Sequence, residues 1–224
     1  MDKIREITSE KVTEYIHGFY RPVSGQLMEL RLQAEAEEVP VILRETEDLL
    51  GVLLSIIRPR RVLEIGAAIG YSAAYFARKT GGQVVTIEKS SEMCQRASEN
   101  IGRLGLTDQI RVIEGDGEEE VRKLSEAGEP PFDFIFIDAA KSHYRRFLDA
   151  AMELTHGGTV IVSDNVLFRG SVAEDGQVQD RRHKTNIRRL QEYMKYIYDH
   201  PSLETSLIAC GDGLAVSRVK EKTE

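Results

Sequence analysis

The sequence lacks several features that would mark a special class of protein. It has no tryptophan, only two cysteines, and neither an internal repeat nor a low-complexity tract. Cys94 and Cys210 lie far apart without the spacing of metal ligands, which predicts reduced thiols in a cytoplasmic protein. No apolar run approaches the roughly 18 residues of a membrane span, and residues 1–6 have no apolar signal core. We therefore expect no membrane partner.

Positive charge is also in short supply. Lys and Arg number 30 against 37 Asp and Glu, for a net charge of −7, which argues against broad, non-specific binding of nucleic acid but allows a local basic patch. A chain of 224 residues with 41% hydrophobic content can bury one full core. We expect a single domain over 1–224, with a helical segment over 1–58 and an α/β core over 60–219.

The order of the predicted elements indicates the fold class. Helices are expected over 9–17, 24–38 and 44–57, after which strands and helices alternate. The expected strands are 61–65, 83–87, 110–113, 134–137, 159–162, 203–209 and 214–219. The expected later helices are 70–79, 90–103, 117–127, 143–154 and 183–200. This pattern predicts an α/β fold with a doubly wound, mostly parallel seven-stranded sheet and a C-terminal antiparallel hairpin around a Gly-rich turn at 211–213.

Two apolar strands end on acidic residues. Asp138 follows one, and Asp164 with Asn165 follows the next. Ligands of open α/β sheets bind outside the carboxyl ends of the strands, so these side chains should converge on one crevice. Two carboxylates and an amide oxygen suit Mg²⁺, and Lys141 can lean over the same crevice. The alternative is that both aspartates are merely helix N-caps.

The loop after the first expected strand favours a cofactor. Gly66 and Gly70 have the spacing Gly-x-x-x-Gly, not that of dinucleotide-binding loops, and Glu64 precedes them. A carboxylate here is badly placed for phosphates but reasonable beside the positive end of S-adenosylmethionine. Glu88, at the second strand end, can accept hydrogen bonds from both ribose hydroxyls. Asp116, after the third strand, can contact the adenine amino group.

Three other interpretations of these loops remain open at this point. The first is an α/β fold with tight turns and no cofactor. The second is a nicotinamide-dependent oxidoreductase, which the glycine spacing and the Asp164-Asn165 pair disfavour. The third is a non-catalytic adenosine-binding module, which would have no need for Lys141.

The motifs at 63–72, 138–141 and 164–165 resemble those of the metal-dependent class I O-methyltransferases, which include the catechol and caffeoyl-CoA enzymes. The resemblance covers roughly residues 40–219. It implies a metal at Asp138, Asp164 and Asn165, with Asp138 also close to the cofactor. It further implies S-adenosylmethionine-binding positions in the first three strand-end loops and the segment before the third helix: Ile42, Glu64, Gly66, Gly70, Tyr71, Ser72, Glu88, Asp116 and Gly117.

The sequence is most similar to the bacterial branch of this family that methylates 5-hydroxyuridine in tRNA. The shared stretches are 68–73, 164–170, 172–175 and 211–215. This resemblance implies a tRNA substrate. The catechol enzymes carry bulky aromatic residues around metal and substrate, whereas this chain has no tryptophan and has Ala139-Ala140 before Lys141, which suggests a more open site. A small catechol-like phenol is the alternative substrate.

The expected chemistry needs an activated oxygen. A neutral hydroxyl is a poor nucleophile, and a divalent ion favours its deprotonated form. Lys141 in its neutral form can take the proton; alternatively, it only forms an ion pair with Asp138 or Asp164. Catechol and 5-hydroxyuracil both present two adjacent oxygens, so one site design serves either.

A basic run lies after the metal-binding motif. Between Arg181 and Lys195, six basic residues face only Glu192, a balance of +5. The candidate RNA-binding residues in it are Arg181, Arg182, Lys184, Arg188 and Arg189. A solvated helix face is the alternative. His143 and His183 are interpreted as ordinary surface or cap residues, and the partly apolar N-terminal segment as the surface of a homodimer.

Overall fold

The computed structural model describes residues 8–173 and 181–221, without the side chains of Arg181 and Arg182. They form one seven-stranded sheet in the order β3-β2-β1-β4-β5-β7-β6. The strands are β1 (Arg61–Ile65), β2 (Gln83–Glu88), β3 (Ile110–Glu114), β4 (Phe134–Ile137), β5 (Val160–Ser163), β6 (Leu203–Ile208) and β7 (Leu214–Val219). The first five are parallel, and β7 runs antiparallel to both β5 and β6. The predicted fold class, including the C-terminal hairpin, is confirmed.

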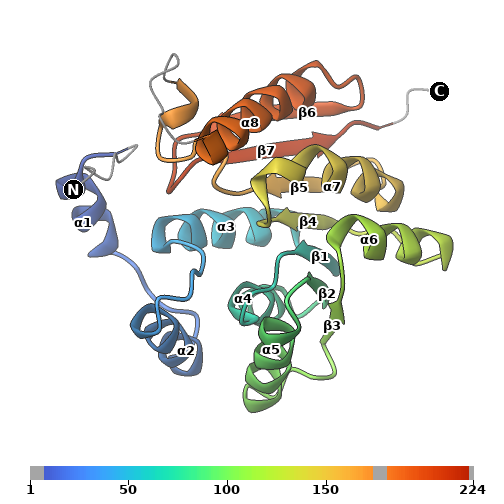
Figure 1. The fold of residues 1–224 in the computed structure, drawn as a ribbon. Helices are drawn as coiled ribbons and strands as arrows, with labels where there is room; N and C mark the ends of the chain where they lie inside the picture. Colours follow the sequence, from blue (N-terminus) through green and yellow to red (C-terminus); the bar gives the residue numbers. More distant parts are fainter. Residues whose placement is uncertain (1–7, 174–180, 222–224) are drawn as a thin grey trace.

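Helices cover both faces of this sheet (Figure 1). The α-helices are α1 (Glu10–His17), α2 (Gly25–Ala36), α3 (Arg44–Ile57), α4 (Tyr71–Thr80), α5 (Ser91–Arg103), α6 (Gly117–Glu126), α7 (Tyr144–Ala151) and α8 (Arg181–Asp199). Short 3-10 turns are η1 (Lys141–His143), η2 (Met152–Leu154) and η3 (Ser171–Ala173). Helices α2 to α5 pack on one face, and α6 to α8 on the other.

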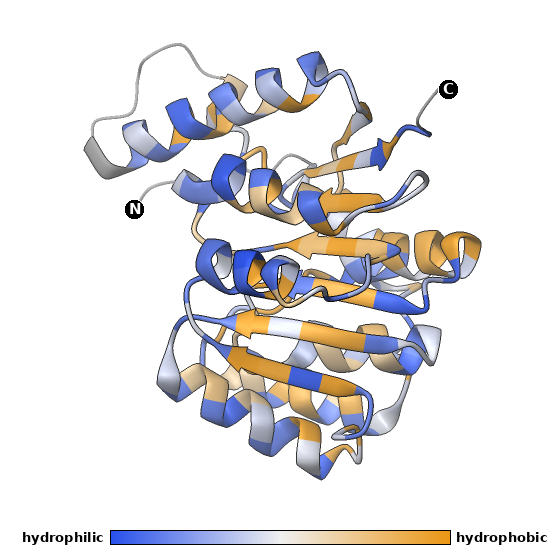
Figure 2. Ribbon diagram, turned by 90° about the vertical axis from the view of Figure 1, so that its right-hand side faces the viewer, coloured by the Kyte–Doolittle hydropathy of each residue, from blue (hydrophilic) through white to orange (hydrophobic). Residues whose placement is uncertain are grey.

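The strands are apolar on both sides because each face of the sheet is covered. Val62 and Phe136 point into one hydrophobic cluster, whereas Leu63 and Ile137 point into the other, and all four are fully buried. Figure 2 shows the result as hydrophobic strands between helices whose outer faces are hydrophilic. Such strands are typical of parallel sheets and leave the polar chemistry to the strand ends.

Three predicted helices differ in extent from those observed, one of them in that α8 begins at Arg181, two residues before the predicted start. The predicted helix over 24–38 ends at Ala36, because Glu38 turns left-handed (φ 56°) and the Val39 N–H caps the Ala34 carbonyl. The predicted helix over 143–154 is divided into η1, α7 and η2, with 3-10 turns at both ends of the α-helical part. The first 3-10 turn matters for the site because it begins at Lys141.

Within residues 8–173 and 181–221, we find no helix with the length and apolar character needed to cross a membrane. The cytoplasmic location stays a prediction.

Candidate active site

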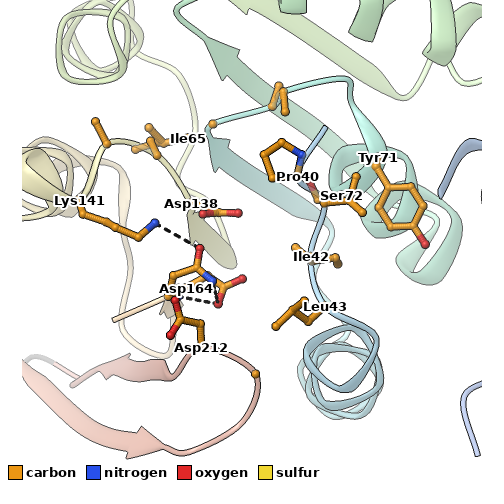
Figure 3. Close-up of a pocket in the computed structure, with 18 of the residues that line it drawn as sticks. Pro40, Ile42, Leu43, Ile65, Tyr71, Ser72, Asp138, Lys141, Asp164 and Asp212 are labelled. Atoms are coloured by element: carbon orange, nitrogen blue, oxygen red, sulfur yellow. Dashed lines mark hydrogen bonds between the residues drawn. The ribbon is translucent and has the colours of Figure 1, made fainter. Parts of the chain in front are cut away.

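A cleft of about 1220 Å³ opens at the carboxyl ends of the parallel strands. Its walls come from the loops after β1 to β5, the turn between β6 and β7, the segment before α3, and residues of α1 and α8. Figure 3 shows these elements facing one another, with Asp138, Lys141 and Asp164 opposite Ile42 and Leu43. The fold thus brings the strand-end motifs to one place, as parallel strands require.

Two carboxylates lie together at the centre of the cleft. Asp164 is 1% exposed, and burial together with the charge of Asp138 raises its pKa well above the ordinary value. Burial also raises the pKa of Asp138, an effect that Lys141 opposes. Asp138 is not a helix cap, because the N-cap of η1 is Ala140. The charge of Asp138 raises the pKa of Asp164, whereas Lys141 lowers the pKa of both acids. A divalent cation would stabilise such a pair of buried carboxylates.

Asn165 and Lys141 complete this group. The Asn165 backbone N–H donates to Asp164 Oδ1 at 2.6 Å, and its side-chain amide donates to the same oxygen at 3.2 Å. The amide oxygen of Asn165 therefore faces the cleft, where Lys141 Nζ donates to it at 3.3 Å. Over the described residues, Lys141 forms no ion pair with Asp138 or Asp164. Asp138, Asp164 and Asn165 thus offer three oxygen ligands that fit Mg²⁺, with the Lys141 amine beside them.

Sequence reasoning missed a third acid. Asp212 sits in the turn between β6 and β7, and Figure 3 shows it next to Asp164. Its pKa is raised by burial, against the effect of the Arg169 N–H and of Lys141. The sequence pattern Gly211-Asp212-Gly213 predicts only a hairpin turn. Asp212 reaches the site because β7 pairs with β5. That pairing joins strands far apart in the sequence, so a local sequence pattern does not reveal it.

The loop after β1 is pinned against the sheet. Gly66 has φ 105°, and a Cβ there would lie 2.0 Å from the Asp138 carbonyl oxygen, so this glycine is needed where β1 and β4 end side by side. Glu88 accepts the Ala68 N–H and the Ser90 N–H, both at 2.8 Å. Glu88 therefore shapes the loop and lines the cleft at once.

Two predicted cofactor residues turn away from the cleft. Glu64 is fully buried beneath the loop, accepts a hydrogen bond from Thr86 Oγ1 at 2.5 Å, and does not line the cleft. Burial raises its pKa to about 7, against the hydroxyls of Ser72 and Thr86. Tyr71 borders the cleft, but its hydroxyl points away from it in Figure 3. Ser72, at the start of α4, lines the cleft.

The remaining predicted cofactor positions lie along the same wall. Ile42 is 3% exposed and lines the cleft from the segment before α3. Asp116 caps α6 through the Glu118 N–H (3.1 Å) and accepts from Lys89 Nζ (3.0 Å), and the Lys89 hydrogen bond lowers its pKa. Gly117 also lines the cleft, whereas Gly70 does not.

A buried polar network holds the N-terminal helices to this wall. Arg31 of α2 and Glu47 of α3, each 2% exposed, form an ion pair. Tyr71 of α4 donates to Glu47 at 2.7 Å, and Tyr20 donates to it at 2.8 Å. Breaking a buried pair by removing one partner is strongly destabilising, so this network fixes α2 and α3 against α4.

The other wall is lined by aromatic and basic side chains. His143 packs edge-on against Phe147 (5.9 Å between ring centres), and Phe168 against His183 (5.7 Å). Both histidines line the cleft. His143 is also the N-cap residue of α7, as the sequence analysis allowed, although its side chain makes no cap hydrogen bond. Arg169 lines the cleft as well. This wall therefore offers flat and cationic groups to a substrate.

The predicted basic run begins at this wall and leads away from it. Lys184, Arg188 and Arg189 are exposed on α8 and do not line the cleft. Arg189 pairs with Glu192 at 3.1 Å. The side chains of Arg181 and Arg182 lie outside the described part of the structure, as do residues 174 and 175 of the shared stretch 172–175.

Comparison with known proteins places the chain in a family. Residues 21–220 match the O-methyltransferase family model. The chain is 32% identical to a catechol O-methyltransferase of Mycobacterium tuberculosis over 84% of its length and 85% of that protein. It is 30% identical to a caffeoyl-CoA O-methyltransferase of Populus kitakamiensis, over 95% of its length and 94% of that protein. The solved O-methyltransferase of Bacillus cereus in complex with SAH superposes with a TM-score of 0.82 at 29% identity, covering 94% and 97% of the two chains. The chain belongs to the O-methyltransferase family.

Proposed function

We propose that the protein transfers the methyl group of S-adenosylmethionine to an oxygen of a substrate with two adjacent oxygens, in a Mg²⁺-dependent reaction, and that this substrate is 5-hydroxyuridine in tRNA. The observation that carries the proposal is the group of Asp138, Asp164 and Asn165 with the Lys141 amine on it. A cleft wall suited to adenosine lies across from this group.

The proposal gives a task to the metal-binding residues, to Lys141 and to two of the cofactor-binding residues. Asp138, Asp164 and Asn165 hold the cation, which when bound supplies positive charge that favours a deprotonated substrate oxygen. Lys141 Nζ, in its neutral form, takes the proton of the substrate hydroxyl. Glu88 and Asp116 bind the ribose and adenine of the cofactor, which when bound supplies the methyl group. Holding the reacting atoms about 3–3.5 Å apart contributes a large share of the rate.

The position of α8 supports the tRNA substrate. This helix packs against η1, which carries Lys141, and His183 in its first turn lines the cleft. Lys184 and Arg188 then lead outward from the cleft along exposed positions. A nucleotide in the cleft would thus have neighbouring phosphates within reach of basic side chains, which is how proteins position nucleic acid backbones.

A small catechol-like phenol is the second candidate. The names of the curated relatives support it, since one is a catechol and another a caffeoyl-CoA O-methyltransferase. Such a phenol offers the same pair of adjacent oxygens.

The test is methylation by purified protein with Mg²⁺ and S-adenosylmethionine, read by mass spectrometry of nucleosides. tRNA containing 5-hydroxyuridine should be methylated, and unmodified tRNA should not, because uridine lacks the acceptor hydroxyl. An excess of chelator should stop the reaction. If hydroxylated tRNA stays unmethylated while catechol is turned over, the second candidate replaces the first.

A homodimer is the last part of the proposal. Large apolar side chains are exposed on and near α1 and α3, among them Tyr15 (70%), Phe19 (63%) and Ile56 (72%). Exposed apolar patches often mark interfaces, and a second copy of the chain would cover them. Light scattering of the purified protein gives the oligomeric state, and a monomer at micromolar concentration would contradict this part alone.

A further inference from the structure

The loop that follows β5 has an unusual backbone. Asn165, Phe168 and Arg169 all take left-handed conformations, with φ of 54°, 45° and 53°, and Gly170 follows with φ 78°. Residues with a Cβ rarely adopt this region, and they persist there only when surrounding contacts hold them. Residues 165–170, hereafter the 165–170 loop, therefore need a clamp.

The turn between β6 and β7 supplies that clamp. The Arg169 N–H donates to Asp212 Oδ1, and the Leu167 N–H donates to the Asp212 carbonyl at 3.0 Å. The Val166 N–H donates to the Gly213 carbonyl, also at 3.0 Å. A Cβ on Gly213 (φ 86°) would lie 2.3 Å from Leu167 Cγ, so the turn and the loop are in close contact. Asp212 is the residue whose side chain makes one of these bonds.

The clamped loop carries groups of the cleft. Asn165 opens it, beside Asp164, and its Oδ1 receives the Lys141 hydrogen bond. Phe168 and Arg169 line the cleft further along. If the loop relaxed toward ordinary backbone angles, these three side chains would be redirected together. The Asp212 side chain controls them through the loop backbone, since its bond is to the Arg169 N–H.

We propose that Asp212 is a positioning residue: its carboxylate oxygen holds the Arg169 N–H, and so keeps the 165–170 loop in the conformation that presents Asn165, Phe168 and Arg169 to the cleft. The role depends on the place of an acceptor oxygen and not on its charge. The effect on metal binding rests on the proposed function; the effect on the loop itself does not.

Two substitutions separate acceptor position from charge. Asp212→Asn keeps an acceptor oxygen at the same distance from the backbone and removes the charge. Asp212→Glu keeps the charge and moves the carboxylate by one methylene. Asp212→Ala removes both, and Asp108→Ala, at an exposed acid, serves as the matched control. Circular dichroism establishes that each variant is folded, and the Asn and Glu variants decide the test if the Ala variant does not fold.

The first measurement is limited digestion of the full chain with trypsin, following cleavage after Arg169 by mass spectrometry. Loss of a hydrogen bond to a charged group should raise this cleavage rate at least about tenfold in Asp212→Glu and Asp212→Ala. In Asp212→Asn and the control, the cleavage rate should stay within about threefold of the wild-type rate. A threefold change corresponds to the low end of the free energies that hydrogen bonds contribute. If all four variants are cleaved at the wild-type rate, the positioning role is wrong.

The second measurement is calorimetric titration of the full chain with Mn²⁺ as the probe. Affinity should fall in Asp212→Glu and Asp212→Ala and be retained in Asp212→Asn, while the affinity for S-adenosylmethionine stays unchanged throughout. Equal losses of Mn²⁺ affinity in Asp212→Asn and Asp212→Ala would show that Asp212 acts through its charge, and would overturn the proposal. If wild type binds no Mn²⁺, the metal part of the proposed function fails, and the trypsin result still decides the role of Asp212.

Discussion

The two walls of the cleft are built differently. One wall, here called the cofactor wall, consists of the loops after β1, β2 and β3. The buried network around Glu47 braces it. The acceptor wall gathers η1, the 165–170 loop, η3, the first turn of α8 and the 211–213 turn, which are far apart in sequence. The 165–170 loop of the acceptor wall includes three residues other than glycine with positive φ. In the loop after β1, on the cofactor wall, Ala68 is the one such residue.

This difference bears on where substrate specificity can vary. A wall made of adjacent strand ends is fixed once the sheet is fixed, and it can serve any O-methyltransferase. A wall made of distant loops can be altered one loop at a time without disturbing the sheet, which is how binding specificity usually varies on a shared fold. Substrate choice should therefore reside in the acceptor wall, and variants of the two walls should have separable effects.

The largest expected effect is on the acceptor wall, at the metal ligands. Asp164→Ala should abolish activity, a loss of roughly 10³-fold or more, because electrostatic activation by a metal contributes several kcal/mol. Binding of S-adenosylmethionine should be nearly unchanged, since Asp164 lies on the opposite wall. Steady-state assays and calorimetry measure the two quantities.

A chelator should inhibit the wild type reversibly, and Asp108→Ala, at an exposed acid, should behave as wild type. Full activity in excess chelator would contradict the metal-dependent mechanism. Asp138→Ala is the less clean test, because Asp138 is also expected to lie close to the cofactor.

Next in size is the effect of removing Lys141. Lys141→Ala should lower turnover by about 10²–10⁴-fold, because a positioned general base contributes that much. Lys141→Arg should not rescue, since arginine cannot be deprotonated in a protein. Cofactor affinity should stay unchanged in both variants. A fully active arginine variant would leave Lys141 an electrostatic role only, toward Asn165 and the nearby carboxylates.

These variants rest on residues that the sequence alone could indicate. The apolar strands and the polar residues that end them are local patterns, so the sheet, the acidic pair, Lys141 and Glu88 could be predicted from short windows. The assignment to O-methyltransferases is confirmed by the family match over residues 21–220. Substrate, metal and residue roles stay predictions.

Apart from the acidic pair, Asn165 and Lys141, the acceptor wall could not be predicted in the same way. Asp212 reaches the site because β7 inserts between β5 and β6, and the register Ser163↔Ala215 sets its place. His183 lines the cleft because α8 packs on η1. Even on the cofactor wall, Glu64 precedes the glycine loop as expected but lies beneath it, since side chains alternate along β1 and that of Glu64 is covered.

The cofactor wall is tested by Glu88→Ala. Hydrogen bonds to a charged group are worth roughly 1.5–3 kcal/mol, so affinity for S-adenosylmethionine should fall at least about tenfold. Loss of the bond to the Ala68 N–H should add to this by loosening the loop. Calorimetry gives the dissociation constant, with Glu92→Ala on the exposed start of α5 as control. An unchanged constant would show that Glu88 is not the ribose ligand.

A smaller effect, on stability, should come from Glu64. Its folded-state pKa of about 7 lies above the ordinary 4.5, so between these values the folded chain keeps a proton that the unfolded chain releases. The free energy of unfolding contributed by this group should therefore fall as pH rises through this window, by about 1.4 kcal/mol per pH unit. Glu64→Gln should flatten that slope in urea titrations between pH 5 and about 7, whereas Glu92→Gln should not. Identical slopes in all three proteins would contradict the raised pKa.

The smallest expected effect is at the outer end of the acceptor wall. Arg188 and Arg189 are exposed, and their pairs with Glu192 (3.7 and 3.1 Å) are surface pairs of little strength, so both guanidinium groups can turn to phosphates. Replacing both by Gln should raise the Michaelis constant for tRNA and spare the turnover number. For a single-stranded site, the slope of log affinity against log salt should flatten by about 0.7 for each phosphate contact removed. Arg58→Gln with Arg60→Gln is the matched control, because these exposed arginines precede β1 at the opposite end of the sheet from the cleft. Equal salt slopes for both double variants and wild type would make the basic run a solvated helix face, and would leave the choice of substrate to the cleft-lining residues of the acceptor wall alone.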